Sequence, residues 1–179
     1  MDETLNQKKI EVNKYITFKL NDEVYGLEMS RVKEIIGIKE IKTVAEAPDY
    51  MKGVIKLRNK ILPVVDLRLR LSMLESECPH ETCIIVVEVM ACKTERHNSS
   101  VQKADMLQQI GVIVDGVSEV YNIKSGEIEE GPSFERGIDT DLIIGLGKVE
   151  EKIIILLDIE KILSSEELIE QLTIEESRS

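Results

Sequence analysis

The chain has 179 residues, of which 42% are hydrophobic and 32% charged, enough for one ordinary domain or two small units sharing an interface. A formal net charge of −11 disfavours nucleic-acid partners, and six aromatic residues without Trp offer few stacking platforms. The longest aliphatic run, Ile153–Leu157, is far shorter than the roughly 20 residues that span a bilayer, and no secretory signal opens the chain, so we expect a cytoplasmic protein without membrane insertion.

Short segments rich in β-branched residues follow a polar N-terminus, residues 1–13, which we expect to be disordered. From Tyr15 to Leu20 apolar and polar residues alternate as in a half-buried strand, and a turn at Asn21–Asp22 leads into a second strand at Val24–Leu27. Further strands are predicted at Glu34–Ile41, Gly53–Leu57, Ile61–Val65, Thr82–Val89, Gln109–Val114, Glu119–Ile123, Ile143–Leu146 and Lys152–Leu157. Strands this short and closely spaced favour an all-β fold of barrels or a sandwich.

Two segments interrupt the series of strands. The polar stretch Ala91–Gln108 predicts an extended surface loop. Residues 164–179 predict a short C-terminal helix and a tail, because Ser164 and Glu167 have the spacing of a capping box. The apolar stripe of this helix consists of Leu168, Ile169 and Leu172.

Two sequence patterns recur in the same order along the chain. Residues 26–35 match 111–120 at an offset of 85, and residues 53–66 match 145–158 at an offset of 92. Half of this chain is near the lower size limit of a stable domain, so we expect two related β units that share an apolar seam. Their boundaries, about 14–81 and 82–163, are soft, and strands can be exchanged between them.

Asp66 and Asp158 hold matching positions, each after an aliphatic strand, and the two together suggest an aspartic-protease pair. Such a pair needs a small hydroxyl residue and Gly after each Asp, whereas Leu67 and Ile159 follow here. We interpret each Asp as the cap of the turn that follows its strand. We therefore expect no catalysis at Asp66 and Asp158.

Soft metal ligands are concentrated in one region of the chain. They are Cys78, His80, Cys83, Cys92 and His97. The spacing lacks both the C-x2-C and the H-x3-5-H pattern of zinc sites, and three cysteines suit reduced thiols. The sequence also lacks nucleophile-elbow and phosphate-binding motifs. We expect no metal, no cofactor and no enzyme activity, and keep a small zinc-bound regulatory barrel using Cys78, His80, Cys83 and Cys92 as the least favoured alternative.

Charge is distributed unevenly. Between Lys52 and Arg70 the local balance is +5, with Asp66 as the one acid. The basic residues are Lys52, Lys56, Arg58, Lys60, Arg68 and Arg70. They form either a solvated hairpin flank or a docking face for an acidic protein surface. Acidic residues gather in the second unit at Glu127, Glu129, Glu130, Glu135, Asp139 and Asp141. Opposite fields on the two units suit a bridging protein.

Several motifs then occur in a fixed order from about Tyr15 to Leu172. They are Val24–Leu27, Val32–Ile35, Ala47–Val54, Leu57–Arg58, Leu62–Arg68, Gly111–Val120 and Leu156–Leu163. In order and spacing the series resembles the CheW family of chemotaxis coupling proteins. Each motif is weak alone, but together they cover nearly the whole chain.

The resemblance implies two SH3-like five-stranded β barrels packed on each other, with short helical turns and a short C-terminal helix. It implies a non-catalytic adaptor between the cytoplasmic tip of chemoreceptors, the methyl-accepting chemotaxis proteins, and the regulatory domain of the chemotaxis histidine kinase. Such a protein is cytoplasmic and recruited to receptor arrays at the inner face of the membrane. The nearer alternative is an adaptor of a related receptor–kinase pathway that does not control motility.

In the family the receptor helix lies in an apolar groove between the barrels. The resemblance places receptor binding at Val32, Glu34, Ile35, Gly53, Arg58 and Val120. The chain departs from the family's N-L-R-G hairpin at Lys56 and Asn59. Because Asn tolerates a left-handed turn, Asn59 is expected to preserve the hairpin, whereas Lys56 is expected to alter receptor preference. The kinase domain, by the same resemblance, meets like barrels end to end through apolar strand edges, more tightly at the second unit.

Overall fold

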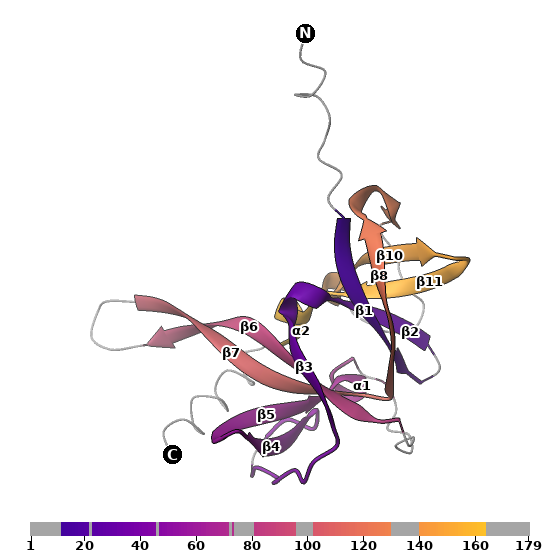
Figure 1. Cartoon of the computed structure of the whole chain (residues 1–179). Coiled ribbons are helices and arrows are strands. Elements are labelled where there is room, and N and C mark those ends of the chain that lie inside the picture. Colours follow the sequence, from indigo (N-terminus) through magenta and orange to yellow (C-terminus); the bar gives the residue numbers. More distant parts are fainter. Residues whose placement is uncertain are drawn as a thin grey trace.

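The computed structural model describes residues 12–21, 23–45, 47–71, 73, 81–95, 102–129 and 140–163 (Figure 1). Its strands form two sheets, with the orders β8-β1-β2-β11-β10-β9 and β3-β6-β7-β5-β4, which we call sheet A and sheet B. Sheet A contains β1 (Val12–Leu20), β2 (Glu23–Glu28), β8 (Gly116–Lys124), β9 (Ile128–Glu129), β10 (Ile143–Val149) and β11 (Lys152–Leu157). Sheet B contains β3 (Val32–Gly37), β4 (Met51–Leu57), β5 (Lys60–Asp66), β6 (Cys83–Glu95) and β7 (Gln102–Val114).

Helices are short throughout the described residues. They are α1 (Leu67–Arg70), α2 (Ile159–Leu163) and the 3-10 turns η2 (Met29–Arg31), η3 (Ser125–Glu127) and η4 (Thr140–Leu142). The expected all-β class with short helical pieces is confirmed. The expected C-terminal helix in residues 164–179 lies outside the described residues, as does the expected disordered N-terminus as far as residue 11.

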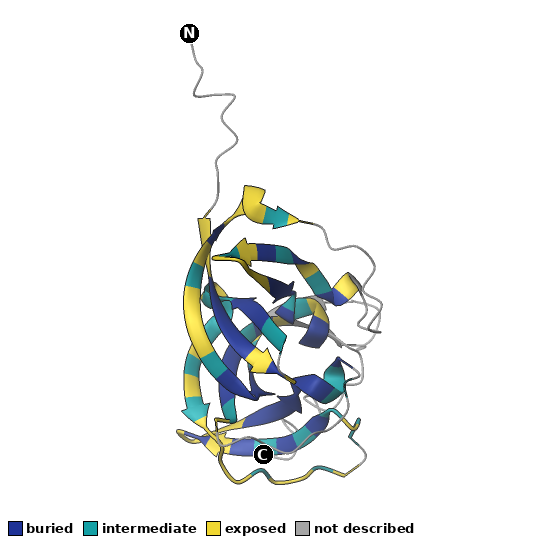
Figure 2. Cartoon of the chain, turned by 90° about the vertical axis from the view of Figure 1, so that its right-hand side faces the viewer, coloured by how far each residue is buried: buried dark blue, intermediate teal, exposed yellow. Residues whose placement is uncertain are grey.

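The core is divided by the alternation of side chains along the strands. In β6, Ile84 and Val86 pack inside sheet B, whereas Ile85, Val87 and Val89 point the other way. The second set belongs to the largest cluster, which lies between the two sheets and which we call the seam cluster. It also contains Phe18, Leu27, Leu157 and Ile162. A third, smaller cluster fills sheet A with Tyr15, Ile123, Ile154 and Leu156. The two sheets therefore share one apolar seam, and Figure 2 shows exposed residues mainly along outer strands and loops.

Strands are exchanged between the two halves of the sequence. The N-terminal hairpin β1–β2 does not join β3–β5; it pairs with β8 on one side and with β11 on the other. Sheet B instead combines β3, β4 and β5 with the β6–β7 hairpin. Neither sheet therefore corresponds to a continuous unit ending near residue 81.

The sequence repeat explains this exchange. Gly26 lies opposite Leu156 in the parallel pair of β2 and β11, and Gly111 lies opposite Val64 in the parallel pair of β7 and β5. A Cβ atom on Gly26 would lie 2.9 Å from Leu156 Cδ2, and one on Gly111 would lie 2.9 Å from Ile84 Cγ2. Both glycines permit a close approach that any side chain would obstruct. Each copy of the glycine segment thus pairs with the aliphatic strand of the other copy.

The prediction of a surface loop at Ala91–Gln108 is wrong for most of this segment. Strand β6 continues to Glu95 and β7 begins at Gln102, and their pairing extends without a break to Glu95 opposite Gln102. The sequence is polar there because this part of the ribbon extends past the other strands of sheet B. The pairing there continues a register that buried residues such as Val87 opposite Ile110 already define.

Candidate functional site

The tip of the β4–β5 hairpin has an unusual backbone. Arg58 and Asn59, with φ of 48° and 66°, are the two residues between the paired Leu57 and Lys60. Two consecutive left-handed residues define a type I′ turn, whose twist matches the flanking strands. Asn59 has the left-handed backbone expected of it. Arg58 shares it, which is uncommon for a long side chain and fixes the direction in which the guanidinium leaves the hairpin.

Arg58 reaches the neighbouring edge of sheet B. Its Nη2 lies 3.0 Å from Oε2 of Glu34, whose side chain is 26% exposed against 78% for Arg58. Glu34 is on β3 and Arg58 follows β4, and these strands are the two ends of the order in sheet B. The ion pair therefore connects the ends of the sheet, and two predicted site residues distant in sequence are in direct contact.

Gly53 has a structural role beside this pair. Its φ is +145°, and a Cβ atom there would lie 2.0 Å from the carbonyl oxygen of Lys42. Lys42 and Val54 exchange two backbone hydrogen bonds of 2.9 Å at this point. Only glycine allows this contact, which joins the segment after β3 to β4. Gly53 is buried, so it shapes the site through its backbone.

Ile35 and Val120 are exposed aliphatic side chains on the edge strands β3 and β8, with 43% and 50% of their surfaces accessible. Ile35 lies opposite Ile85, and Val120 lies opposite Ile16. Both partners belong to the seam cluster, and directly opposed residues share a face of the sheet. Ile35 and Val120 therefore border the seam from sheet B and sheet A. They are also equivalent in the repeat, at the offset of 85.

Val32 is the remaining predicted site residue, and it packs partly buried against the seam cluster. The register of β3 shifts between Val32 and Glu34, so one extra residue separates the seam contact from the ion pair. The structure thus brings Val32, Glu34 and Ile35 onto one edge strand and Arg58 into contact with it. Val120 comes from the other sheet.

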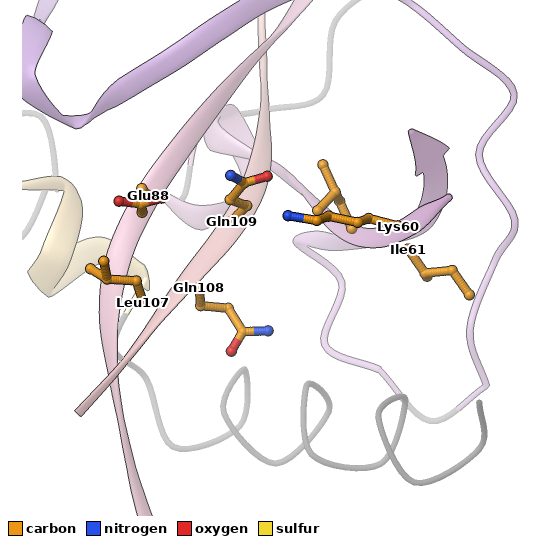
Figure 3. Close-up of a pocket in the computed structure, with 7 residues that line it drawn as sticks. Lys60, Ile61, Glu88, Leu107, Gln108 and Gln109 are labelled. Carbon is orange, nitrogen blue, oxygen red and sulfur yellow. The ribbon is translucent and has the colours of Figure 1, made fainter. Parts of the chain in front are cut away.

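A groove of about 340 Å³ opens on sheet B and begins at Lys60, beside the β4–β5 turn (Figure 3). It lies between β5 and the β6–β7 ribbon, where Lys60, Ile61, Glu88 and Leu107 line it. Sequence reasoning missed it because its position depends on the extension of β6 and β7. The side chains of Ile61 and Leu107 are 56% and 60% exposed.

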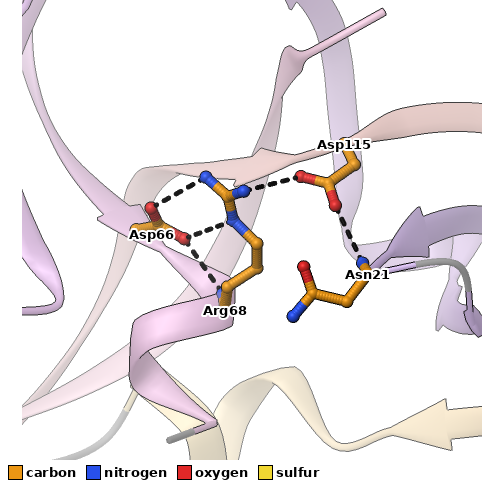
Figure 4. A network of polar contacts seen from close by, with 4 residues as sticks. All are labelled: Asn21, Asp66, Arg68 and Asp115. Carbon is orange, nitrogen blue, oxygen red and sulfur yellow. Dashed lines mark hydrogen bonds and ion pairs between the residues drawn. The ribbon is translucent and has the colours of Figure 1, made fainter. Parts of the chain in front are cut away.

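The basic window from Lys52 to Arg70 does not form one docking face. Arg68 is only 1% exposed, and its guanidinium lies between two carboxylates (Figure 4). Its Nη2 is 3.4 Å from Asp66 Oδ2, and its Nη1 is 3.3 Å from Asp115 Oδ1. Asp115 Oδ2 also accepts a 2.8 Å hydrogen bond from the backbone N–H of Asn21. The group therefore ties α1 of sheet B to the β1–β2 turn of sheet A.

Arg70 is also used within the fold. Its Nε donates a 2.8 Å hydrogen bond to the carbonyl of Ile162 in α2, and its guanidinium lies 5.4 Å from the centroid of the Tyr50 ring. The docking-face interpretation fails for these two arginines because a capping turn follows β5 and points them inward. Lys56, Arg58 and Lys60 remain exposed at the hairpin tip.

The interpretation of Asp66 and Asp158 as caps is confirmed. Asp66 Oδ1 accepts a 3.0 Å hydrogen bond from the N–H of Arg68 at the start of α1. Asp158 Oδ1 accepts a 3.2 Å hydrogen bond from the N–H of Lys161 in α2. The caps satisfy backbone donors that the first turn of a helix leaves free.

The suggested metal ligands are only partly described. Cys83 is half-buried, and burial raises the pKa of its thiol against a smaller opposite effect of a backbone hydrogen bond at Val117. Within the described residues no group of three or more His, Cys, Asp or Glu side chains could hold a metal ion. Cys78, His80 and His97 lie outside these residues, and the side chain of Cys92 is not described. In the same part of the chain, no helix has the length and hydropathy needed to cross a bilayer.

Two sheets with one shared core, exposed aliphatic side chains on edge strands and an exposed ion pair at a hairpin tip are features of a protein–protein interaction module. The model of the CheW-like domain matches residues 14–167, most of the chain. The protein therefore belongs to the CheW-like family.

Known proteins agree with this assignment. The chemotaxis protein CheW of Klebsiella aerogenes is 33% identical over 154 residues, which cover 86% of this chain and 83% of that protein. CheW of Bacillus subtilis is 30% identical, with 86% and 88% covered. The crystal structure of the scaffolding protein TtCheW from Thermoanaerobacter tengcongensis matches with a TM-score of 0.72 and 30% identity, covering 87% of this chain and 95% of that one.

Proposed function

We propose that this chain is a non-catalytic chemotaxis adaptor that couples the cytoplasmic tip of chemoreceptors to the regulatory domain of the chemotaxis histidine kinase. Membership of the CheW-like family and the names of its relatives support this role. The protein acts in the cytoplasm, in receptor arrays at the inner face of the membrane. The observation that carries the receptor half of the proposal is the contact of Glu34 with Arg58, which joins the two end strands of sheet B.

The receptor helix binds along the edge of the seam. Ile35 and Val120 offer apolar contacts from the two sheets, and Arg58 and Glu34 offer one charge of each sign. A helix with an apolar stripe and flanking polar residues matches this combination. Two residues act through the structure beneath this surface. Val32 packs against the seam cluster, and Gly53 allows the contact that joins β4 to the segment after β3.

The kinase domain binds through an exposed stretch of strand β11 in the second unit. Ile153, which precedes the residues of β11 that pair with β2, is 58% exposed. An exposed isoleucine suits an apolar contact with a domain built from like barrels. The second unit carries the tighter contact, through the β10–β11 hairpin that bears Ile153.

The proposal predicts separable effects on the two partners. Arg58→Glu and Glu34→Lys should each weaken binding of a soluble receptor tip fragment by more than about thirtyfold, or ~2 kcal/mol, because each reversal leaves a desolvated charge unpaired. Binding of the kinase regulatory domain should change less than about threefold, within ~0.5 kcal/mol. Calorimetric titration with each partner measures both values.

A charge swap separates the two roles of the ion pair. Arg58→Glu combined with Glu34→Arg restores the attraction within the protein, so receptor affinity should stay low if these charges contact the receptor and should recover if they only brace the hairpin. Glu150→Lys, at the equivalent tip of sheet A, is the matched control and should leave receptor binding unchanged. Normal receptor affinity in both single variants, or equal losses toward receptor and kinase, contradicts the assignment.

A further inference from the structure

The groove on sheet B begins next to the place where the described chain ends. Helix α2 ends at Leu163, which packs in the seam cluster with Val89 of β6. The N–H···O contact from Arg70 Nε to the carbonyl of Ile162, 2.8 Å long, anchors the same turn. Val89 lies opposite Gln108 of β7, and Gln108 lines the groove. Directly opposed residues share a face, so α2 and Gln108 lie on the same side of sheet B.

Sixteen residues follow Leu163, and they have the composition to cover this face. Leu168, Ile169 and Leu172 form one apolar stripe at helical spacing. From Val89 across β7 to β5 is two strand spacings, about 10 Å. A helix that rises about 1.5 Å per residue carries Leu168 about 8 Å and Leu172 about 14 Å beyond Leu163, which matches that span.

The charges of the two partners also favour contact between residues 164–179 and the groove. Residues 164–179 contain five glutamates and one arginine. The groove presents the exposed Lys60, and Glu88, the one acidic residue among its described lining residues, is paired with Lys33 at 3.4 Å. In Figure 3 the side chains of Gln108 and Ile61 point to the same side of the groove. Ile61 is therefore the exposed aliphatic side chain that a segment crossing from α2 meets.

We infer that residues 164–179 dock in cis across β7 and β5, with Leu168 and Leu172 on Ile61 and their acidic neighbours beside Lys60. The matching family model ends at residue 167, just before Leu168. Docking shields Ile61 on sheet B and leaves its equivalent on sheet A, Ile153, open. The two barrels then differ in the surface they offer. This inference does not depend on the identity of the receptor or the kinase.

Nuclear Overhauser spectra of the full chain, labelled in the methyl groups of Ile and Leu, test the inference. We expect cross-peaks between the Ile61 methyl and those of Leu168 or Leu172. Leu172→Asp should remove them and shift the Ile61 resonance, whereas Thr173→Asp, which adds the same charge beside the stripe, should leave Ile61 in place. The Ile153 resonance should move in neither variant.

Three results would overturn the inference. The first is the lack of any cross-peak from Leu168 or Leu172 to Ile61 in the unaltered chain. The second is an Ile61 resonance that Leu172→Asp does not shift. The third is a set of cross-peaks that arises between labelled and unlabelled molecules in a mixed sample, because that result places the segment on a second copy.

Discussion

The hairpins β4–β5 and β10–β11 share one turn conformation, but the residues in the two turns carry opposite charge. The first turns at Arg58 and Asn59 with φ of 48° and 66°, and the second turns at Glu150 and Glu151 with φ of 47° and 67°. Each hairpin also has a register shift next to a glycine, Gly53 in one and Gly145 in the other. Backbone geometry is therefore repeated while surface charge has diverged, which gives one scaffold two unlike faces.

The divergence extends to the neighbours of each turn. Glu34 pairs with Arg58, whereas the equivalent positions in sheet A hold two acids, Glu119 and Glu150. The pKa of the Tyr121 phenol is raised there, first by its hydrogen bond to Glu119 and then by burial and by the charges of Glu119 and Glu150. The turn of sheet A thus presents carboxylates where the turn of sheet B holds an ion pair.

A second contrast lies beneath the hairpins. Arg68 in α1 is enclosed by Asp66 and Asp115, whereas its equivalent in α2, Glu160, pairs with Arg31 at 2.5 Å with about a third of each side chain exposed. The same position thus holds opposite charges at different depths. Buried and partly exposed ion pairs respond very differently to loss of one partner.

Replacing Arg68 gives the largest expected difference between the halves. Arg68→Met should lower the free energy of unfolding by about 3–5 kcal/mol, because Asp66 and Asp115 stay buried without their cation. Glu160→Gln, at the equivalent position, should cost less than about 1 kcal/mol. Urea unfolding measures both, and Asp115→Asn provides a milder probe if Arg68→Met does not fold. Equal small losses for Arg68→Met and Glu160→Gln would mean that the buried network contributes no more than a surface pair.

Replacing the two hairpin glycines compares how strongly each hairpin depends on its backbone contact. Gly53→Ala should cost about 3 kcal/mol or more, since the new methyl group meets the Lys42 carbonyl and φ is in a strained region. Gly145→Ala should cost about 1–3 kcal/mol, because its methyl group meets Ile128 Cγ2 and the Glu129 carbonyl, which can move apart by a small amount. Thermal unfolding of the two variants ranks them. A larger loss for Gly145→Ala contradicts the assigned roles.

The two capping aspartates should also differ in how much they contribute to the free energy of unfolding. Asp158→Ala removes a cap and should cost about 1 kcal/mol. Asp66→Ala removes a cap and a partner of the buried Arg68, so the loss should reach about 2–4 kcal/mol. Chemical denaturation of both variants, with the unaltered chain as reference, gives the difference. If the two losses agree within error, Asp66 acts as a cap alone.

The smallest expected effect concerns alkaline pH. Burial raises the pKa of Tyr25 to about 12 from an ordinary value of 10.0. The neutral phenol is therefore favoured in the folded state, so its contribution is complete below pH 10 and is lost as pH rises toward 12. Tyr25→Phe should reduce this alkaline loss by on the order of 1 kcal/mol. Unfolding measured at pH 8 and at pH 11 in both proteins tests it, and parallel losses would exclude Tyr25 as the cause.

Much of the fold could be predicted because its signals are local or repeated. Alternation placed most strands within a few residues, and the repeat at offsets of 85 and 92 related the two glycine segments to each other and the two aliphatic strands to each other. What the repeat could not indicate was that each copy pairs with the other, as Gly26 does with Leu156 and Gly111 with Val64, because pairing within a copy satisfies the same pattern. The polar residues beyond Met90 also carried no sign that the pairing of the ribbon would continue.

The candidate site was predictable in part. The left-handed turn at Asn59 follows from residue type, whereas the contact of Arg58 with Glu34 depends on sheet B bringing its two ends together. The burial of Arg68 was missed because a run of basic residues indicates a solvated face. Asp66 two residues before Arg68 and Asp115 in the other repeat were its only signals, and their meeting requires the tertiary fold.

The exchange of strands sets the order in which the protein can mature on the ribosome. Sheet B is encoded without interruption between Val32 and Val114, so its barrel can close while the rest of the chain is still being made. Strand β2 pairs with β1 at once, but it cannot acquire its second partner until Ile155 emerges, 130 residues after Tyr25. At bacterial elongation speeds of about 5–20 residues per second, the open edge of β2 waits on the order of ten seconds. Nascent chains stalled before β11 therefore combine a complete sheet B with one unpaired strand edge, a form open to chaperones and to aggregation.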